Sequence, residues 1–189
     1  MARHQSRNDG GPARWIAAAL AACALAAGGA SAGAAGSDAN ADPIGKLAIY
    51  AGSWNSRIVH YRTTYTQARV ETTLARNDCW RSDVYYACDQ FINGRSAAFV
   101  VYTYSAGERL YHIQVIPKNG VAVATGTLAI TGNAWTFPWQ YQAKGKTIFV
   151  KIVNVFPDAN TIEFHEAFSY DRKHWTPTAD GVERRTNAR

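Results

Sequence analysis

The chain lacks the short motifs that announce several common chemistries. It has no Gly-x-Ser-x-Gly elbow for a serine nucleophile, no Gly-rich phosphate loop and no Cys-x-x-Cys pair. Cysteine is scarce, with three residues in 189, and only one long apolar run occurs, near the N-terminus. These absences give no support to nucleophilic catalysis, nucleotide binding or thiol redox chemistry, and the part of the chain beyond residue 36 is not expected to span a membrane as a helix.

The first 36 residues differ from the rest and predict a secretory signal peptide. An apolar run over 15–25 is preceded by three basic residues, Arg3, Arg7 and Arg14. Small residues follow, and Ala30-Ser31-Ala32 fits a cleavage site, with Ala34-Ala35-Gly36 nearby. A basic segment, a short apolar segment and a small-residue site are typical of an exported protein. We therefore expect a leader over 1–36 and a periplasmic or extracellular location.

A second interpretation of this leader is a lipid anchor. Leu20-Ala21-Ala22-Cys23 has the look of a bacterial lipoprotein box, in which Cys23 would be acylated. Only eight residues separate Arg14 from Cys23, near the lower limit for the apolar segment, and apolar residues continue beyond the cysteine. Lipid anchoring is the minor alternative, and only in that case is a membrane an expected partner.

Removal of the leader leaves 153 residues, 37–189, which suit one domain that buries about two-thirds of its unfolded surface. They carry 17 basic and 13 acidic residues, a formal charge of +4. Such a mild excess is weak evidence for nucleic acid, and no nucleic-acid partner is expected. The oligomeric state is not predicted.

The remaining pair of cysteines, Cys79 and Cys88, predicts a disulfide. An even pair in an exported protein is typical of a structural bridge. The intervening residues allow a turn near Arg81-Ser82-Asp83, with the two cysteines on facing strands. A redox pair or half of a metal site has neither the spacing nor a nearby histidine in its favour.

A regular spacing of turn residues gives the fold class. Marker positions 94, 107, 120, 132, 145, 158 and 171 lie 12 or 13 residues apart, and several belong to Asn-Gly pairs or similar hairpin signals. The segments between them are rich in Val, Ile, Tyr, Phe and Thr. With three earlier strands (54–65, 67–79, 84–92) and one later (174–185), this predicts an all-β, ten-stranded antiparallel up-and-down barrel. No sequence repeat accompanies this regular spacing of turns, which disfavours a propeller.

A short helix is expected ahead of the first strand. Asp42 can cap it, Pro43 suits its first position, and Ile44, Leu47, Ala48 and Ala51 fall on one face. Gly52 would end it. We expect this helix to close the barrel end that Trp54 fills.

Several of these features together resemble the calycin group, which includes the lipocalins and the fatty-acid-binding proteins. The features are Gly52-x-Trp54 at a first strand, the ten-strand meander, and Arg184 and Arg185 late in the last strand. The resemblance implies that Arg184 or Arg185 packs over Trp54. The chain is most similar to an uncharacterised family of bacterial exported calycin-like domains, over about 42–186. The matching features are Gly52-Ser53-Trp54, the cysteine pair, Trp135 to Trp139, and Ser169-Tyr170-Asp171 before Trp175 and a later Arg.

Alternation places an aromatic face inside the barrel. Trp135, Phe137, Trp139 and Tyr141 share one face of a strand, with Tyr102, Tyr104 and Tyr111 on neighbouring strands. Pro138 cannot donate to a ladder, so a bulge or local opening is expected there. Phe164, Phe168 and Glu166 form another inward face. These side chains either line a ligand pocket or fill a solid core.

Glu166 is the polar residue on this apolar face, and a buried carboxylate needs a partner. Arg57, Arg62 and His112 are candidates. Glu166 would orient a ligand's polar group, act as an acid or base in a calycin-type isomerase or cyclase, or only cross-link the barrel. The histidines lack metal-ligand spacing, and we expect no metal, cofactor or catalytic residue.

The sequence therefore predicts a secreted barrel that binds a small apolar or amphipathic ligand in its lumen. The main alternative is a filled structural barrel that binds a protein or cell-envelope partner through its exterior.

Overall fold

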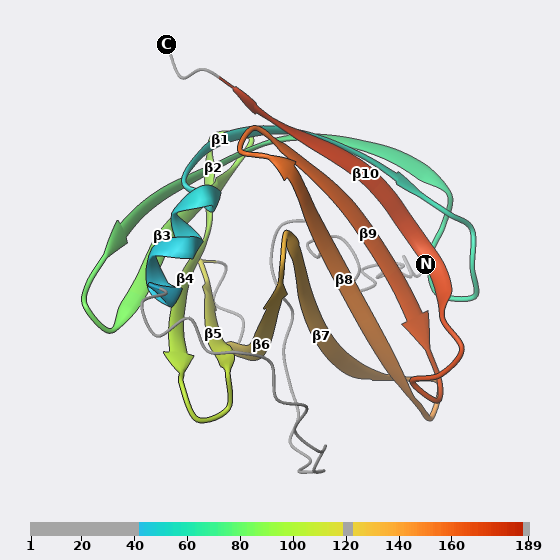
Figure 1. The fold of residues 1–189 in the computed structure, drawn as a ribbon. Helices are drawn as coiled ribbons and strands as arrows, with labels where there is room; N and C mark the ends of the chain where they lie inside the picture. The colour runs from blue at the N-terminus through green and yellow to red at the C-terminus, as the bar shows by residue number, and fades with distance from the viewer. Residues whose placement is uncertain (1–41, 119–122, 187–189) are drawn as a thin grey trace, which may run out of the picture.

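The computed structural model describes residues 42–118 and 123–186. A short helix precedes ten strands (Figure 1). The elements are α1 (Pro43–Lys46), a 3-10 turn η2 (Leu47–Tyr50), β1 (Gly52–His60), β2 (Arg69–Arg81), β3 (Tyr85–Ile92), β4 (Arg95–Ser105), β5 (Leu110–Pro117), β6 (Ala124–Thr131), β7 (Ala134–Ala143), β8 (Lys146–Asp158), β9 (Thr161–Ser169) and β10 (Thr176–Thr186).

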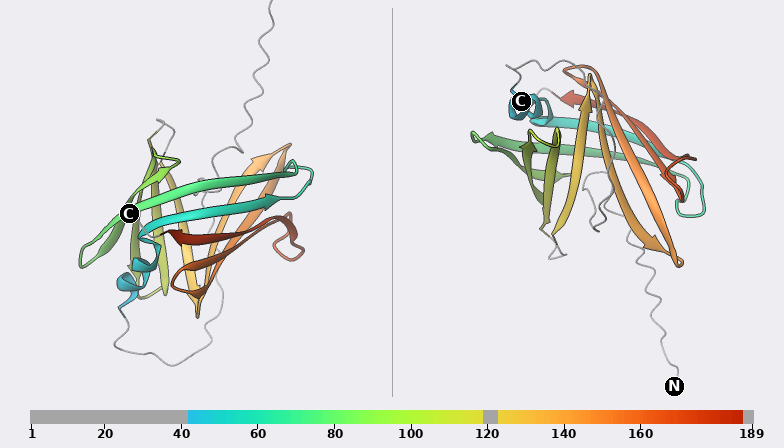
Figure 2. Two further views of the ribbon diagram at one scale, coloured as in Figure 1. Left: turned by 90° about the horizontal axis from the view of Figure 1, so that it is seen from above. Right: turned by 60° about the horizontal axis from the view of Figure 1, so that its bottom comes forward.

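The strands form one closed antiparallel barrel in which sequence neighbours pair throughout. Pairing of β1 with β10 closes it, with Trp54 opposite Arg185 and Ser56 opposite Glu183. Figure 2 shows β1 between β2 and β10. Closure removes the free outer edges that a flat sheet would expose. The predicted all-β ten-stranded meander is confirmed.

The hairpin turns lie where the sequence indicated, for a conformational reason. Asn93 and Gly94 have φ values of 50° and 76°, and Lys144 and Gly145 have 50° and 71°. Positive φ at both central residues matches the twist of adjoining strands. The expected turn at Asn119-Gly120 lies outside the described residues, as do the predicted leader (1–36) and Cys23.

The helix starts at its predicted cap but changes type after one turn. Asp42 Oδ1 accepts a hydrogen bond from the Gly45 amide at 2.9 Å, and Pro43 occupies the first helical position. From Leu47 to Tyr50 the chain is a 3-10 helix. Leu47 and Ile44 are buried in the main core, and the Tyr111 hydroxyl donates to the Pro43 carbonyl at 2.7 Å. These contacts hold the segment against the barrel.

The β6–β7 ladder is the shortest in the described barrel. Only three residue pairs join the two strands, and the last residue of β7 in this pairing is Thr136. Figure 1 shows the two strands spreading apart from their hairpin. The local opening expected at Pro138 is present, because ladder pairing with β6 has ended there. The bulge is not: β7 and β8 keep a continuous register through Pro138, opposite Lys151.

Cys79 and Cys88 lie directly opposite each other on β2 and β3 and form the predicted disulfide. Such a bond is consistent with an exported, oxidising location. Within the described ranges, we find no helix both long and apolar enough for a membrane crossing.

Candidate functional site

One end of the barrel is organised around Trp54. The Arg185 guanidinium lies over the indole, 4.2 Å from the ring centroid. Its nitrogens donate to the Ile49 carbonyl at 2.7 Å and the Ala51 carbonyl at 2.5 Å, and to the Ala159 carbonyl at 3.1 Å. The Trp54 indole N–H donates to the Tyr50 carbonyl at 3.1 Å. Arg185 thus ties the helical segment to the closing strand, while Arg184 is exposed.

Gly52 serves this arrangement through its backbone. Its φ of +100° is one that side chains disfavour, and an added Cβ would lie 2.9 Å from an Arg185 guanidinium nitrogen. Glycine is therefore required both by conformation and by the approach of Arg185.

Next to this end, the barrel contains a cavity of about 120 Å³ that is partly open to solvent. An apolar wall faces a set of polar side chains. The apolar lining includes Trp54, Ala75, Val100, Val115, Phe137, Ile152, Ile162 and Phe164. The polar lining includes Tyr50, Ser56, Thr73, Asn77, Gln90, Tyr102, Asn154 and Glu183. Such a combination suits a small molecule with both kinds of surface.

The amides in the cavity are linked through Tyr50. Asn154 Nδ2 donates to the Tyr50 hydroxyl at 2.7 Å, and Asn77 Nδ2 donates to the Tyr50 carbonyl at 3.1 Å. Gln90 Nε2 in turn donates to Asn77 Oδ1 at 3.3 Å. The amide oxygens of Gln90 and Asn154 are buried and have no hydrogen-bond partner among the described residues. Burial of an unpaired acceptor is costly, so a ligand that donates hydrogen bonds to these two oxygens would remove that cost.

Glu183 supplies the one acidic group of the cavity lining described here. Burial raises the pKa of its carboxyl group to about 7, because desolvation disfavours the charged form. Burial also raises the pKa values of the Tyr50 and Tyr102 phenols, which remain neutral. Glu183 was not among the predicted site residues. Strand alternation is the sequence feature that could have indicated it, because Glu183 lies two residues before Arg185 and therefore on the same face of β10.

The predicted aromatic face is divided between three places. Phe137 and Phe164 line the cavity. Trp135 packs below it, with its ring centroid 4.9 Å from those of Tyr50 and Phe156. Tyr141 and Phe168 belong to a second cluster with Tyr65, Ile148 and Val150, and Trp139 packs against both this cluster and the main core. Of the three other tyrosines considered, Tyr102 lines the cavity, whereas Tyr104 and Tyr111 pack against each other with tilted rings, 4.9 Å between centroids.

Glu166 has a different partner from those expected. Its Oε1 accepts a hydrogen bond from the Thr178 hydroxyl at 2.6 Å, and burial raises its pKa. His112 instead contacts Glu108 at 2.5 Å. A bulge in the β9–β10 pairing, between Pro177 and Ala179, brings Thr178 to Glu166. Glu166 therefore does not line the cavity beside Trp54 but a second pocket, together with Lys151 and His165, and its hydrogen bond to Thr178 joins β9 to β10.

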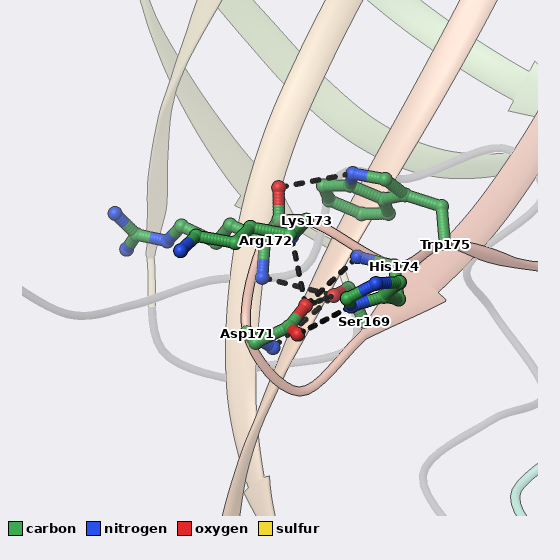
Figure 3. Close-up of polar contacts among 6 residues, drawn as sticks. All are labelled: Ser169, Asp171, Arg172, Lys173, His174 and Trp175. Atoms are coloured by element: carbon green, nitrogen blue, oxygen red, sulfur yellow. Dashed lines mark hydrogen bonds and ion pairs between the residues drawn. The ribbon is translucent and has the colours of Figure 1, made fainter.

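A Ser–Asp–His cluster in the loop before β10 has a structural geometry. Asp171 lies between the other two: it accepts from the Ser169 hydroxyl at 3.0 Å and contacts His174 Nδ1 at 2.7 Å (Figure 3). The amides of Lys173 and His174 also donate to Asp171, and these bonds lower its pKa well below the usual range. A catalytic triad needs the histidine on the serine, so this cluster is a loop cap.

No group of three or more His, Cys, Asp or Glu side chains able to hold a metal ion occurs within 42–118 and 123–186. His60 is buried beside Glu71, with Nε2 3.3 Å from the carboxylate.

Strand order and closure define the molecule as a ten-stranded antiparallel β-barrel protein. No family model and no curated protein matches the chain. Among solved structures, it is similar to a redesigned β-barrel, at 10% identity and TM-score 0.35, over 74% of this chain and 94% of that one. It is also similar to Rv2717c from M. tuberculosis, at 12% identity and TM-score 0.44, over 78% of this chain and 99% of that one. The calycin-like assignment remains a prediction.

Proposed function

We propose that this protein binds a small amphipathic molecule in the lumen of its barrel. The supporting observation is the cavity of about 120 Å³, in which an apolar wall faces two unpaired amide oxygens and the Glu183 carboxyl group. A cavity of about 150 Å³ in another protein is large enough for benzene, so the ligand, or the part of it that enters, has a comparable size.

A cavity-filling substitution tests this function. Ala75 lines the cavity, and Ala75→Leu places extra side-chain volume in it. Thr72→Leu is the matched control, because Thr72 is exposed on the same strand. Native mass spectrometry and solvent extraction of the purified protein, with NMR titration of small alcohols, would report binding. We expect Ala75→Leu to weaken binding at least tenfold and Thr72→Leu to leave it unchanged. The absence of any retained or added ligand in the native protein would contradict the proposal.

Export forms a separate part of the proposal. It is supported by the basic and apolar leader over 1–36 and by the Cys79–Cys88 disulfide. A periplasmic or extracellular barrel would meet ligands outside the cytoplasm.

The exterior of the barrel supports a second candidate, binding of a protein or envelope partner. Trp80 is 44% exposed and stacks on Phe99, with 5.4 Å between ring centroids. The Lys118 ammonium lies 5.8 Å from the Phe99 centroid. On this alternative, Trp80→Ser would release the protein from a purified envelope fraction and Ala75→Leu would not. If instead Ala75→Leu lowers ligand retention and Trp80→Ser does not, the lumen is favoured as the binding site.

The calycin-type isomerase or cyclase is the least supported alternative. It requires Glu166 within hydrogen-bond reach of a histidine or tyrosine in a cleft, whereas the hydrogen-bond partner of Glu166 is Thr178.

A further inference from the structure

The polar groups that line the cavity are mainly hydrogen-bond acceptors, and the one ionisable carboxyl group among them has no basic side chain beside it in the described lining. Among the described residues that line it, none is Lys, Arg or His, and Glu183 is acidic. The two unpaired amide groups present oxygen, because the Gln90 nitrogen is already bonded to Asn77 and the Asn154 nitrogen to Tyr50. The cavity therefore offers hydrogen-bond acceptors and negative charge.

The arginine on the same face of β10 as Glu183 makes its contacts elsewhere. Arg185 follows two residues later on β10, but its guanidinium lies on the Trp54 ring and bonds to the carbonyls of Ile49 and Ala51. The neighbours of Glu183 across the sheet are Ser56 on β1 and Ile162 on β9, neither of which is charged. The titratable groups on the remaining walls of the cavity are the phenols of Tyr50 and Tyr102.

We propose that the group bound in the lumen is cationic and rich in hydrogen-bond donors, a primary ammonium on a short apolar chain, with its charge against Glu183 and its N–H groups on Gln90 Oε1 and Asn154 Oδ1. This inference rests on the proposed lumenal function and specifies its ligand class. An ammonium has three donors and no acceptor, which matches three acceptor groups. Its chain would lie against Phe137, Ile152 and Phe164.

The same lining disfavours an anionic ligand such as a carboxylate. A second carboxylate in the cavity would add like charge beside Glu183, and the lining provides no arginine or lysine to bind it. A neutral alcohol could donate one hydrogen bond but would leave the Glu183 charge without a counter-ion. Charge pairing in a desolvated site is stronger than at the surface, so the ligand classes should separate clearly.

The raised pKa of Glu183 gives the binding a defined pH dependence. With no ligand, burial keeps this pKa at about 7. An ammonium binds the ionised carboxylate, so its affinity should rise on the order of tenfold per pH unit below about pH 6 and level off above about pH 8. At neutral pH, binding should also release a proton from Glu183 in part of the molecules, visible as a buffer-dependent heat.

The experiment compares three probes of equal length, n-butylamine, 1-butanol and butyrate, by isothermal titration calorimetry with NMR detection at pH 7.5. We expect the ammonium to bind at least tenfold more tightly than the alcohol, and butyrate to bind least. Glu183→Gln should abolish this preference and the pH dependence while retaining alcohol binding. Glu163→Gln, on the exposed face of neighbouring β9, is the matched control and should preserve both.

The outcomes separate the two proposals. If the alcohol binds in the lumen as tightly as the ammonium, or butyrate binds more tightly, the cationic ligand class is wrong and the lumenal function stands. If the Glu183→Gln variant keeps the ammonium preference, and its NMR spectrum shows that the fold is unchanged, the role assigned to Glu183 is wrong. If none of the three probes binds and no extracted ligand is found, both proposals fail.

Discussion

The guanidinium of Arg185 covers the indole of Trp54 at 4.2 Å and at the same time bonds to the backbone at Ile49 and Ala51. One side chain near the end of the last strand therefore fixes the start of the first strand and the helical segment before it. Because Trp54 is almost completely buried, this contact also seals the end of the barrel below the cavity.

Removal of this side chain should destabilise the barrel. Arg185→Ala deletes the ring contact and leaves three carbonyl groups without their charged donor, and we expect a loss of about 2–4 kcal/mol in the free energy of unfolding. Arg184→Ala, next in sequence but exposed, should change it by less than about 0.5 kcal/mol. Urea denaturation followed by tryptophan fluorescence measures both. Equal effects of the two variants would contradict the structural role of Arg185.

Close approach of two strands makes Gly181 sensitive to a single methyl group. A Cβ there would lie 2.7 Å from the Arg57 carbonyl oxygen and 2.8 Å from Ile58 Cγ1, so β1 and β10 would have to separate. Gly181→Ala should cost about 1–3 kcal/mol. Gly126→Ala is the control, since a Cβ there meets nothing within 4 Å. We expect it to be neutral or slightly stabilising in thermal unfolding; a Gly181→Ala protein as stable as this control would be unexpected.

The Cys79–Cys88 disulfide closes a short loop between β2 and β3. On the chain-entropy model, replacement of both cysteines by serine should lower stability by about 2–3 kcal/mol. Reduction of the native protein should have a similar effect in denaturant titrations, whereas the double variant should be insensitive to reductant. Sensitivity of the variant to reductant would mean that another thiol is involved.

Burial of Glu183 should make stability depend on pH. Its pKa is about 7 in the folded protein and about 4.5 unfolded, so the folded state holds the proton more tightly. Stability from this group is complete below about pH 4.5 and is lost as pH rises through about 7, up to about 3 kcal/mol. Glu183→Gln should therefore unfold at a higher temperature than the native protein at pH 8, and the difference should shrink toward pH 4.5. A constant difference across this range would contradict the assignment.

The leader prediction is checked by mass. Cleavage after Ala32 in an exporting host would leave a chain that begins at Gly33, and cleavage after Gly36 one that begins at Ser37. A lipoprotein would instead begin at an acylated Cys23, with a large mass increase. Intact-mass spectrometry of the exported protein separates these products, and a mass that retains residues 1–36 would contradict export by cleavage.

Local signals explain why so much of the fold could be predicted. Turns such as Asn93-Gly94 depend on backbone conformations that few residue pairs adopt, and the Asp42 cap depends on two neighbouring residues. Pro138 indicated a local opening because it has no N–H to donate, and it lies on the part of β7 that has lost its pairing with β6 while keeping its register with β8. Signals of this kind depend only on residues close together in the chain, so they can be recognised from the sequence alone.

The site was harder to predict because neighbouring residues do not decide which face of a strand points into the lumen or how far along the barrel a side chain lies. The sequence left open whether Arg184 or Arg185 meets Trp54, and that choice decides whether Glu183 faces the lumen. The bulge between Pro177 and Ala179 shifts parity in β10, so alternation could not be carried through from Trp175. Similarly, alternation placed Trp135 and Trp139 on one face, but it could not indicate that Trp135 lies within the main cluster while Trp139 packs against both clusters.

The sequence by itself determined the number of strands, their order, the disulfide and the helical start, because each depends on short-range backbone chemistry or on a single pair of residues. Only the tertiary structure decided that a cavity remains between the packed aromatics, and that Glu183, Gln90 and Asn154 face it with no cation beside them in its described lining. Closure of the barrel turns residues of β3, β8 and β10 toward the same cavity, and their spacing along the chain does not indicate this arrangement.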